Sequence, residues 1–163
     1  MIIIGETGTG KSTLCNFLTG NRCDSKEFKV GNSKIKRGTE ETTIKSHAFF
    51  LGDKNRPFTI IDTPGFNDPG RLVNGSRNDD KAIVNELMSK LSTVNHINLF
   101  VVCLNGAVLE LRESMRYVLN YFRDIFGVKM EQGEPRKDAN VFWRRCFIVV
   151  TKMHMDENSI KPN

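Results

Sequence analysis

The chain alternates short apolar runs with amphipathic stretches, and this rhythm predicts an α/β fold. Strands are predicted over residues 1–4, 45–51, 58–61, 97–104 and 146–150. The last two runs are rich in Ile, Val, Leu and Phe, which is typical of parallel strands covered on both faces. The turn-rich segment 52–57 predicts an antiparallel hairpin between the second and third strands.

Three stretches carry apolar residues at helical spacing. Helices are predicted over residues 11–18, 79–91 and 109–126. The first would place Leu14, Phe17 and Leu18 on one face, and Gly127 is placed to end the third. The polar segment 127–140 is predicted to be a loop. The expected fold class is α/β of three layers, α/β/α, with helices on both faces of a mostly parallel sheet that has one antiparallel hairpin strand.

The composition predicts one globular domain. The 163 residues are 39% hydrophobic and 26% charged, which excludes disorder as the dominant state. The longest nearly apolar run, 97–104, is far shorter than the roughly 20 residues of a membrane-spanning helix. The four cysteines lack CxxC spacing, which favours reduced structural thiols and a cytoplasmic location. They are Cys15, Cys23, Cys103 and Cys146.

The net charge of the chain does not alter the prediction of one globular domain. The formal net charge is +5, but the basic residues are dispersed along the chain. No run of basic residues interleaved with aromatic residues is present, so we expect a solvated surface and no nucleic-acid partner.

The first motif with clear chemistry is GETGTGKS at residues 5–12, which matches GxxxxGK[ST] between a predicted strand and a predicted helix. Its glycines allow positive φ, so that successive N–H groups can point at a phosphate, and the helix N-terminus adds its dipole. Lys11 offers a charge to the β- and γ-phosphates, and Ser12 offers a hydroxyl to Mg²⁺. The predicted nucleotide-binding residues here are Gly5, Glu6, Thr7, Gly8, Thr9, Gly10, Lys11, Ser12 and Thr13.

The second motif, DTPG at residues 62–65, follows the apolar run 58–61. An acid at the end of a strand can hold Mg²⁺ through water, which makes Asp62 a candidate metal residue. Gly65 can offer its N–H to the γ-phosphate because no side chain blocks the approach. Together, the two motifs predict a P-loop nucleoside triphosphatase whose two loops sense the terminal phosphate.

The segments GETGTGKSTLCNFLTG, IIDTPGFND and FIVVTK resemble the G domain of septin-like GTPases, most closely the AIG1-type (GIMAP-like) group. The resemblance covers nearly the whole chain and implies GTP or GDP, Mg²⁺ and GTP hydrolysis. It also implies a Mg²⁺-ligating threonine in a mobile loop after the first helix. The candidates are Thr39, Thr42 and Thr43, and the place of Thr39 in GTEET favours it. The implied metal residues are Ser12, Thr39 and Asp62.

One position departs from the usual GTPase pattern at the site of chemistry. Many GTPases carry a water-orienting Gln directly after DxxG, and this chain carries Phe66 there. A phenyl ring cannot hydrogen-bond a water, so we expect slow hydrolysis without a partner. Septin-like families pair their G domains across the nucleotide face, which implies a homodimer. Arg22 and Arg37 are conceivable residues in trans, although both are also typical surface arginines.

The base motif departs as well. GTPases usually read guanine with [NT]KxD, but here Thr151 and Lys152 are followed by His154 where Asp is expected. Asp156 lies two residues late and would require a shifted loop. The resemblance implies Thr151, Lys152 and His154 as base-site residues, and guanine selectivity rests on that resemblance.

Two other functions stay open, together with the extent of the domain. A degenerate module that binds nucleotide without turnover would account for Phe66 and His154. A P-loop kinase or ATPase would need an arginine-rich lid, which is not evident. The chain stops soon after the fifth predicted strand, so we expect residues 1–163 to form a single GTPase domain that is incomplete at its C-terminus. Membrane association would then come from segments outside it.

Overall fold

The described part of the chain is built around one mixed sheet. The computed structural model describes residues 1–22, 25–30, 42–66, 72–73, 76–77, 80–94, 96–108, 111–131 and 133–152. Within them the sheet has the order β2-β3-β1-β6-β9. Its strands are β1 (Ile2–Gly5), β2 (Thr43–Phe49), β3 (Pro57–Asp62), β6 (Phe100–Asn105) and β9 (Cys146–Thr151).

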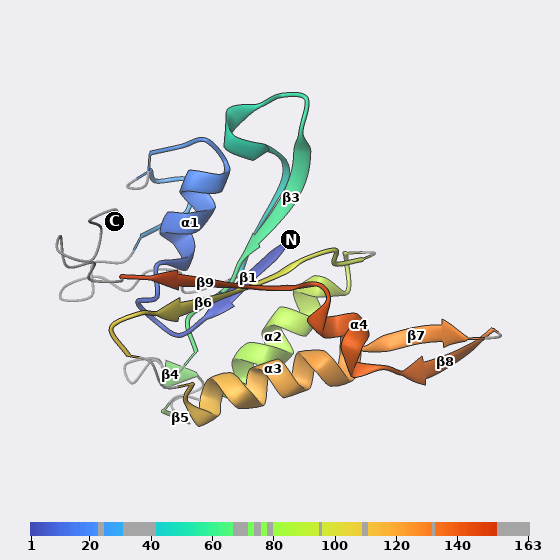
Figure 1. Ribbon diagram of the computed structural model, residues 1–163. Coiled ribbons are helices and arrows are strands. Elements are labelled where there is room, and N and C mark those ends of the chain that lie inside the picture. Colours follow the sequence, from blue (N-terminus) through green and yellow to red (C-terminus); the bar gives the residue numbers. More distant parts are fainter. Residues whose placement is uncertain are drawn as a thin grey trace, which may run out of the picture.

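The strand directions confirm the predicted sheet. β1 pairs in parallel with β3 and β6, and β6 pairs in parallel with β9. β2 runs antiparallel to β3, as the turn-rich segment between them predicted (Figure 1). The carboxyl ends of the four parallel strands therefore meet at one edge, and this edge is where α/β proteins bind their ligands.

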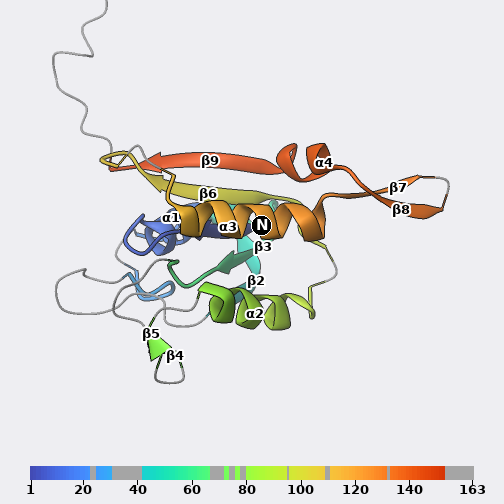
Figure 2. The same ribbon diagram turned by 90° about the horizontal axis from the view of Figure 1, so that it is seen from below.

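Helices cover both faces of the sheet, which confirms the three-layer α/β fold (Figures 1 and 2). α1 (Lys11–Leu18) lies on one face, and α2 (Asp80–Leu91) and α3 (Glu113–Phe126) lie on the other. The alternation along β1 shows this, because Ile2 and Ile4 pack with α2 and α3, whereas Ile3 packs with Cys15 of α1.

The apolar residues at helical spacing that predicted α2 and α3 pack into the core. Their fully buried members include Ile83, Val84, Leu87, Met115, Val118 and Phe122. The prediction for α1 was wrong in one respect, because Phe17 is 53% exposed. Lys11 and Cys15 lie one turn apart on the buried face of α1, and Phe17 therefore points away from it.

Several element boundaries differ from the predicted ones. β2 begins at Thr43 and ends at Phe49, because η1 (Phe50–Gly52), a 3-10 turn with Leu51 at φ 50°, follows it. β6 begins at Phe100 rather than at residue 97, although Ile97 is also buried. α3 begins at Glu113 rather than at residue 109, because Arg112 has an extended backbone.

The prediction of a loop over 127–140 was wrong. This segment forms β7 (Val128–Glu131), β8 (Glu134–Lys137) and the start of α4 (Ala139–Trp143), which the Asp138 side chain caps. β7 and β8 are an antiparallel hairpin that projects away from the sheet (Figures 1 and 2). Gly133 turns at φ 86°, and every residue of β8 is exposed, so no apolar alternation marked it.

The strand prediction for 146–150 was correct, but its expected burial was not. Phe147 and Ile148 are 61% and 66% exposed, because β9 lies at the edge of the described sheet and pairs with β6. An apolar run shows that a strand forms, whereas its neighbours decide how much of it is covered. Two further two-residue strands, β4 (Leu72–Val73) and β5 (Ser76–Arg77), pair with each other.

Three of the cysteines lie within the described residues and are free thiols. Cys15 and Cys103 are buried, and Cys146 is half-buried. Burial raises the pKa of Cys103 and of Cys146 to about 11, and it raises the pKa of Cys15 further. These thiols are therefore protonated near neutral pH and pack as small apolar side chains. None of the described helices has the length and apolar character needed to cross a membrane.

Candidate functional site

The GETGTGKS segment forms the turn between β1 and α1. β1 ends at Gly5 and α1 begins at Lys11, while Gly8 and Gly10 have φ angles of 79° and 84°. Only glycine takes these angles readily. The first intrahelical bond joins the Leu14 N–H to the Gly10 carbonyl at 2.9 Å, so the preceding N–H groups of α1 have no acceptor within the helix. Such a helix start suits an anion.

Lys11 is buried at the centre of this turn. It is 5% exposed, and its Nζ donates to the Glu6 carbonyl at 2.9 Å. Thr9 Oγ1 donates to the same carbonyl at 2.8 Å, so both side chains close the loop on itself. Burial lowers the pKa of Lys11, and the nearby Asp62 carboxylate works in the opposite direction. A desolvated ammonium at a helix start fits a phosphate as its partner.

The two predicted motifs meet at a hydrogen bond between Ser12 and Asp62. Ser12 Oγ donates to Asp62 Oδ2 at 2.7 Å across 50 residues of sequence. Asp62 is the last residue of β3 and is 1% exposed. A hydroxyl and a carboxylate are the oxygen ligands that Mg²⁺ prefers, so this pair fits the cation in its chemistry.

The third predicted metal residue, Thr39, lies outside the described residues. Of its alternatives, Thr43 is exposed at the start of β2, opposite Asp62 in the strand pairing. Thr42 is buried, and its carbonyl accepts from Lys90 Nζ of α2 at 3.2 Å. The Thr42 hydroxyl finds no partner among the described residues.

The DTPG segment lies directly against the phosphate loop. A Cβ on Gly65 would come within 2.1 Å of Thr7 Oγ1 and 2.5 Å of Thr7 Cα, so only glycine fits there. The Phe66 N–H donates to the Gly5 carbonyl at 3.2 Å, and the Thr7 N–H donates to the Phe66 carbonyl at 2.9 Å. The N–H of Thr7, which we predicted to face a phosphate, is therefore bound to Phe66 in this structure.

The Phe66 side chain is fully buried in the core among residues that include Ile2 and Ile4. The Phe66 ring therefore points away from the phosphate loop, although the Phe66 backbone is hydrogen-bonded to that loop. Many GTPases carry a water-orienting Gln at this position, whereas in this chain the residue there, Phe66, is part of the hydrophobic core.

The predicted base residues are described in part. Thr151 Oγ1 lies 2.7 Å from the Thr9 carbonyl and 3.1 Å from the Leu104 carbonyl, so the end of β9 is fastened to the phosphate loop. Lys152 follows with φ 54° and is exposed. His154 and Arg37 lie outside the described residues, and Arg22 is exposed.

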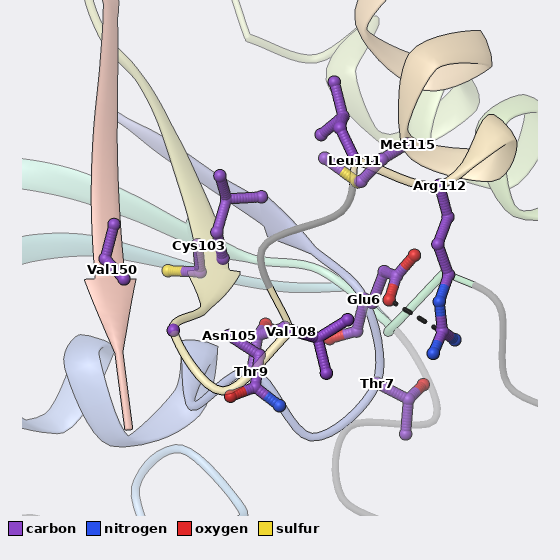
Figure 3. A pocket seen from close by; sticks show the side chains of 12 residues that line it. Glu6, Thr7, Thr9, Cys103, Asn105, Val108, Leu111, Arg112, Met115 and Val150 are labelled. Carbon is purple, nitrogen blue, oxygen red and sulfur yellow. Dashed lines mark hydrogen bonds and ion pairs between the residues drawn. The ribbon is translucent and has the colours of Figure 1, made fainter. Parts of the chain in front are cut away.

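A pocket of about 210 Å³ lies between the phosphate loop and the start of α3 (Figure 3). It is lined by Glu6, Thr7, Thr9, Cys103, Leu104, Asn105, Gly106, Val108, Leu111, Arg112, Met115 and Val150. At its rim, Glu6 Oε1 accepts from Ser114 Oγ at 3.3 Å, and Glu6 Oε2 lies 3.7 Å from Arg112 Nη1. Sequence reasoning missed Arg112, although the segment after β6 had to reach the same sheet edge as the phosphate loop.

Comparison of the chain with known proteins identifies its family. A family model described as 50S ribosome-binding GTPase matches residues 1–132. The chain is 31% identical over 68 residues to cell division control protein 10 of Candida albicans and to neuronal-specific septin-3 of Danio rerio. Each match covers 42% of this chain and 19% of the relative. It is 27% identical over 124 residues to GTPase Der of Buchnera aphidicola, covering 76% of this chain and 24% of that protein.

A solved structure has a similar fold. It superposes with a TM-score of 0.50 at 18% identity, covering 91% of this chain and 48% of the other. The work that describes it reports that dimerisation is important for the GTPase activity of the chloroplast translocon components atToc33 and psToc159. The chain thus spans about a fifth to a quarter of the length of the curated relatives it matches and about half of this structure. With its phosphate loop, its DTPG segment and a family match over most of its length, the chain belongs to the P-loop GTPases of the 50S ribosome-binding GTPase family.

Proposed function

We propose that this chain binds GTP with Mg²⁺ at the loop 5–12 and hydrolyses it slowly, as a switch controlled by dimerisation. The observation that carries the proposal is the buried Lys11 at the start of α1, beside the Ser12–Asp62 pair. These three side chains supply one cation for phosphate and two oxygen ligands for a metal. The family match supports guanine nucleotide over other phosphates.

Each residue has a distinct part in this proposal. Lys11 would bind the β- and γ-phosphates, with the N–H groups at the start of α1. Ser12 and Asp62 would hold Mg²⁺, and Thr39 is the proposed third residue. When bound, Mg²⁺ neutralises charge on the phosphates. Gly65 would approach the γ-phosphate, because its lack of a side chain lets the DTPG segment lie against the loop.

Slow hydrolysis follows from the burial of Phe66. Because this ring is fully buried, no side chain at that position can orient a water. Catalysis would then depend on a group from another loop or from a second copy across the nucleotide face. The reported importance of dimerisation for the structurally similar translocon GTPases supports a homodimer here. The AIG1-type assignment and a cytoplasmic location stay predictions.

The alternative with a specific observation in its favour is a nucleotide-binding module without turnover. The buried Phe66 supports it as well, since it removes the usual catalytic side chain. Both functions require nucleotide binding, so they differ only in whether GTP is consumed.

The first test is equilibrium binding of a fluorescent, non-hydrolysable GTP analogue to the purified chain, with and without Mg²⁺. We expect saturable, Mg²⁺-dependent binding that GTP displaces more effectively than ATP. Equal displacement by ATP would contradict guanine selectivity, and an absence of binding would contradict the proposal as a whole.

A further inference from the structure

An acidic side chain in a phosphate-binding loop opposes nucleotide binding unless its charge is compensated. Glu6 is the second residue of the loop 5–12, and its side chain is only 21% exposed. A bound nucleoside triphosphate brings several negative charges to the same loop, and they repel a nearby carboxylate most strongly where water is scarce. A positive partner for the Glu6 carboxylate would offset this repulsion.

The start of α3 supplies this partner. Arg112 Nη1 lies 3.7 Å from Glu6 Oε2, and Ser114 Oγ donates to Glu6 Oε1 at 3.3 Å. Figure 3 shows the carboxylate facing the Arg112 guanidinium. The N-terminus of α3 favours a nearby anion as well. Lys11 lies within electrostatic reach of Glu6, but its ammonium donates to the Glu6 carbonyl and is the predicted phosphate ligand.

Packing gives the loop little support on this side. Glu6, Thr7 and Thr9 all line the 210 Å³ pocket, so the space between the loop and α3 is not filled by side chains. The Glu6 side chain therefore depends on its polar contacts with Arg112 and Ser114 for its orientation.

We propose that Arg112 is a positioning residue for nucleotide binding, which orients and neutralises the Glu6 carboxylate so that the phosphates meet a loop of low negative charge. This inference rests on the proposed function, because it concerns the same loop. Arg112 acts through Glu6, so its contribution disappears once residue 6 carries no charge. The contribution also grows with the number of phosphates on the nucleotide.

The test is a double-mutant cycle on the full chain, with fluorescent analogues of GTP and GDP. We expect Arg112→Ala to weaken GTP binding about tenfold and to weaken GDP binding less. Glu6→Gln keeps the backbone of the loop and removes the repelling charge, so it should bind more tightly than the wild type, and E6Q/R112A should stay within about twofold of E6Q. The matched control is Arg123→Ala, which removes a charge from the last turn of α3, where Arg123 pairs with Asp124, and should leave binding unchanged.

Three outcomes would overturn the inference: R112A binding like the wild type, E6Q binding as weakly as R112A, or E6Q/R112A binding as weakly as R112A. The last would mean that Arg112 contacts the nucleotide itself. Thermal unfolding checks that the variants fold, and Arg112→Gln replaces R112A if that variant does not. A wild-type chain that binds neither analogue contradicts the proposed function, whereas normal wild-type binding with an insensitive R112A contradicts this inference alone.

Discussion

The phosphate side and the base side of the proposed nucleotide site differ in how many contacts hold them. The loop 5–12 is fastened to β3 through Asp62, to the DTPG segment through Phe66 and to α3 through Arg112. The base side, within the described residues, consists of Thr151 and the exposed Lys152. Within the described residues, the proposed phosphate side is therefore tied to the core of the fold at several points, whereas the proposed base side offers the Thr151 hydroxyl contacts and an exposed lysine.

Loss of the Lys11 side chain should weaken nucleotide binding more than any other single substitution proposed for the two sides. We expect Lys11→Ala to weaken binding of the GTP analogue about 100-fold, because a charge-assisted contact with two phosphates disappears. Lys54→Ala is the control, since Lys54 is an exposed lysine in the turn before β3. If Lys152→Ala weakened binding as much as K11A, the difference between the two sides would disappear.

The next effect tests the contact between the DTPG segment and the loop. Gly65→Ala should destabilise the chain by about 1–3 kcal/mol and weaken nucleotide binding, because its Cβ overlaps Thr7. Adding Thr7→Ala should not rescue it, since Thr7 backbone atoms also lie within 3 Å. In the same denaturation and binding assays, Gly133→Ala, where a Cβ would meet nothing within 4 Å but φ is 86°, should destabilise the chain by about 1–2 kcal/mol and leave nucleotide binding unchanged, which separates lost stability from lost binding.

A smaller loss of nucleotide binding is expected from substitution of Thr151, where the proposed phosphate side and base side meet. Thr151→Ala removes the hydroxyl that lies 2.7 Å from the Thr9 carbonyl, and we expect about fivefold weaker binding. Thr151→Ser keeps the hydroxyl and should bind like the wild type. Equal weakening in T151S and T151A would show that nucleotide binding does not depend on the hydrogen bond between this hydroxyl and the Thr9 carbonyl.

The smallest effect is a pH dependence with opposite signs for stability and binding. Burial lowers the pKa of Lys11 in the free chain, so above that pKa and below the ordinary value of 10.5 the unfolded chain binds more protons. The contribution of Lys11 to stability therefore rises with pH in this window. Phosphate raises the pKa of Lys11 again, so nucleotide binding takes up a proton and weakens as the pH rises. Chemical denaturation and binding titrations at several pH values measure the rise in stability and the fall in nucleotide affinity. The control is Lys11→Met, which should show neither pH dependence.

Much of the fold could be predicted because its signals are local. Three of the predicted strands lie within one residue of β1, β3 and β9, and the apolar stripes of α2 and α3 are buried as expected. The hairpin β7–β8 could not be predicted, because its strands are short, mostly charged and interrupted by Pro135. The burial of β9 depended on neighbours that no local pattern specifies.

In the candidate site, too, the residues of local motifs could be predicted, whereas contacts between distant parts of the chain could not. The two motifs indicated Lys11, Ser12 and Asp62, and the structure brings these three residues together. The pairing of Glu6 with Arg112 joins residues more than 100 positions apart, so no spacing rule could indicate it. The inward orientation of Phe66 was also hidden, because the sequence shows which residue follows DTPG but not where its ring points.

We propose that this chain binds GTP and hydrolyses it slowly under the control of dimerisation. The most direct test is the rate of phosphate release from GTP per chain, measured with Mg²⁺ over a wide range of protein concentrations. We predict a low rate when the protein is dilute and a higher rate per chain when it is concentrated. A rate per chain that is independent of concentration would contradict control by dimerisation, and no release at any concentration would contradict hydrolysis itself.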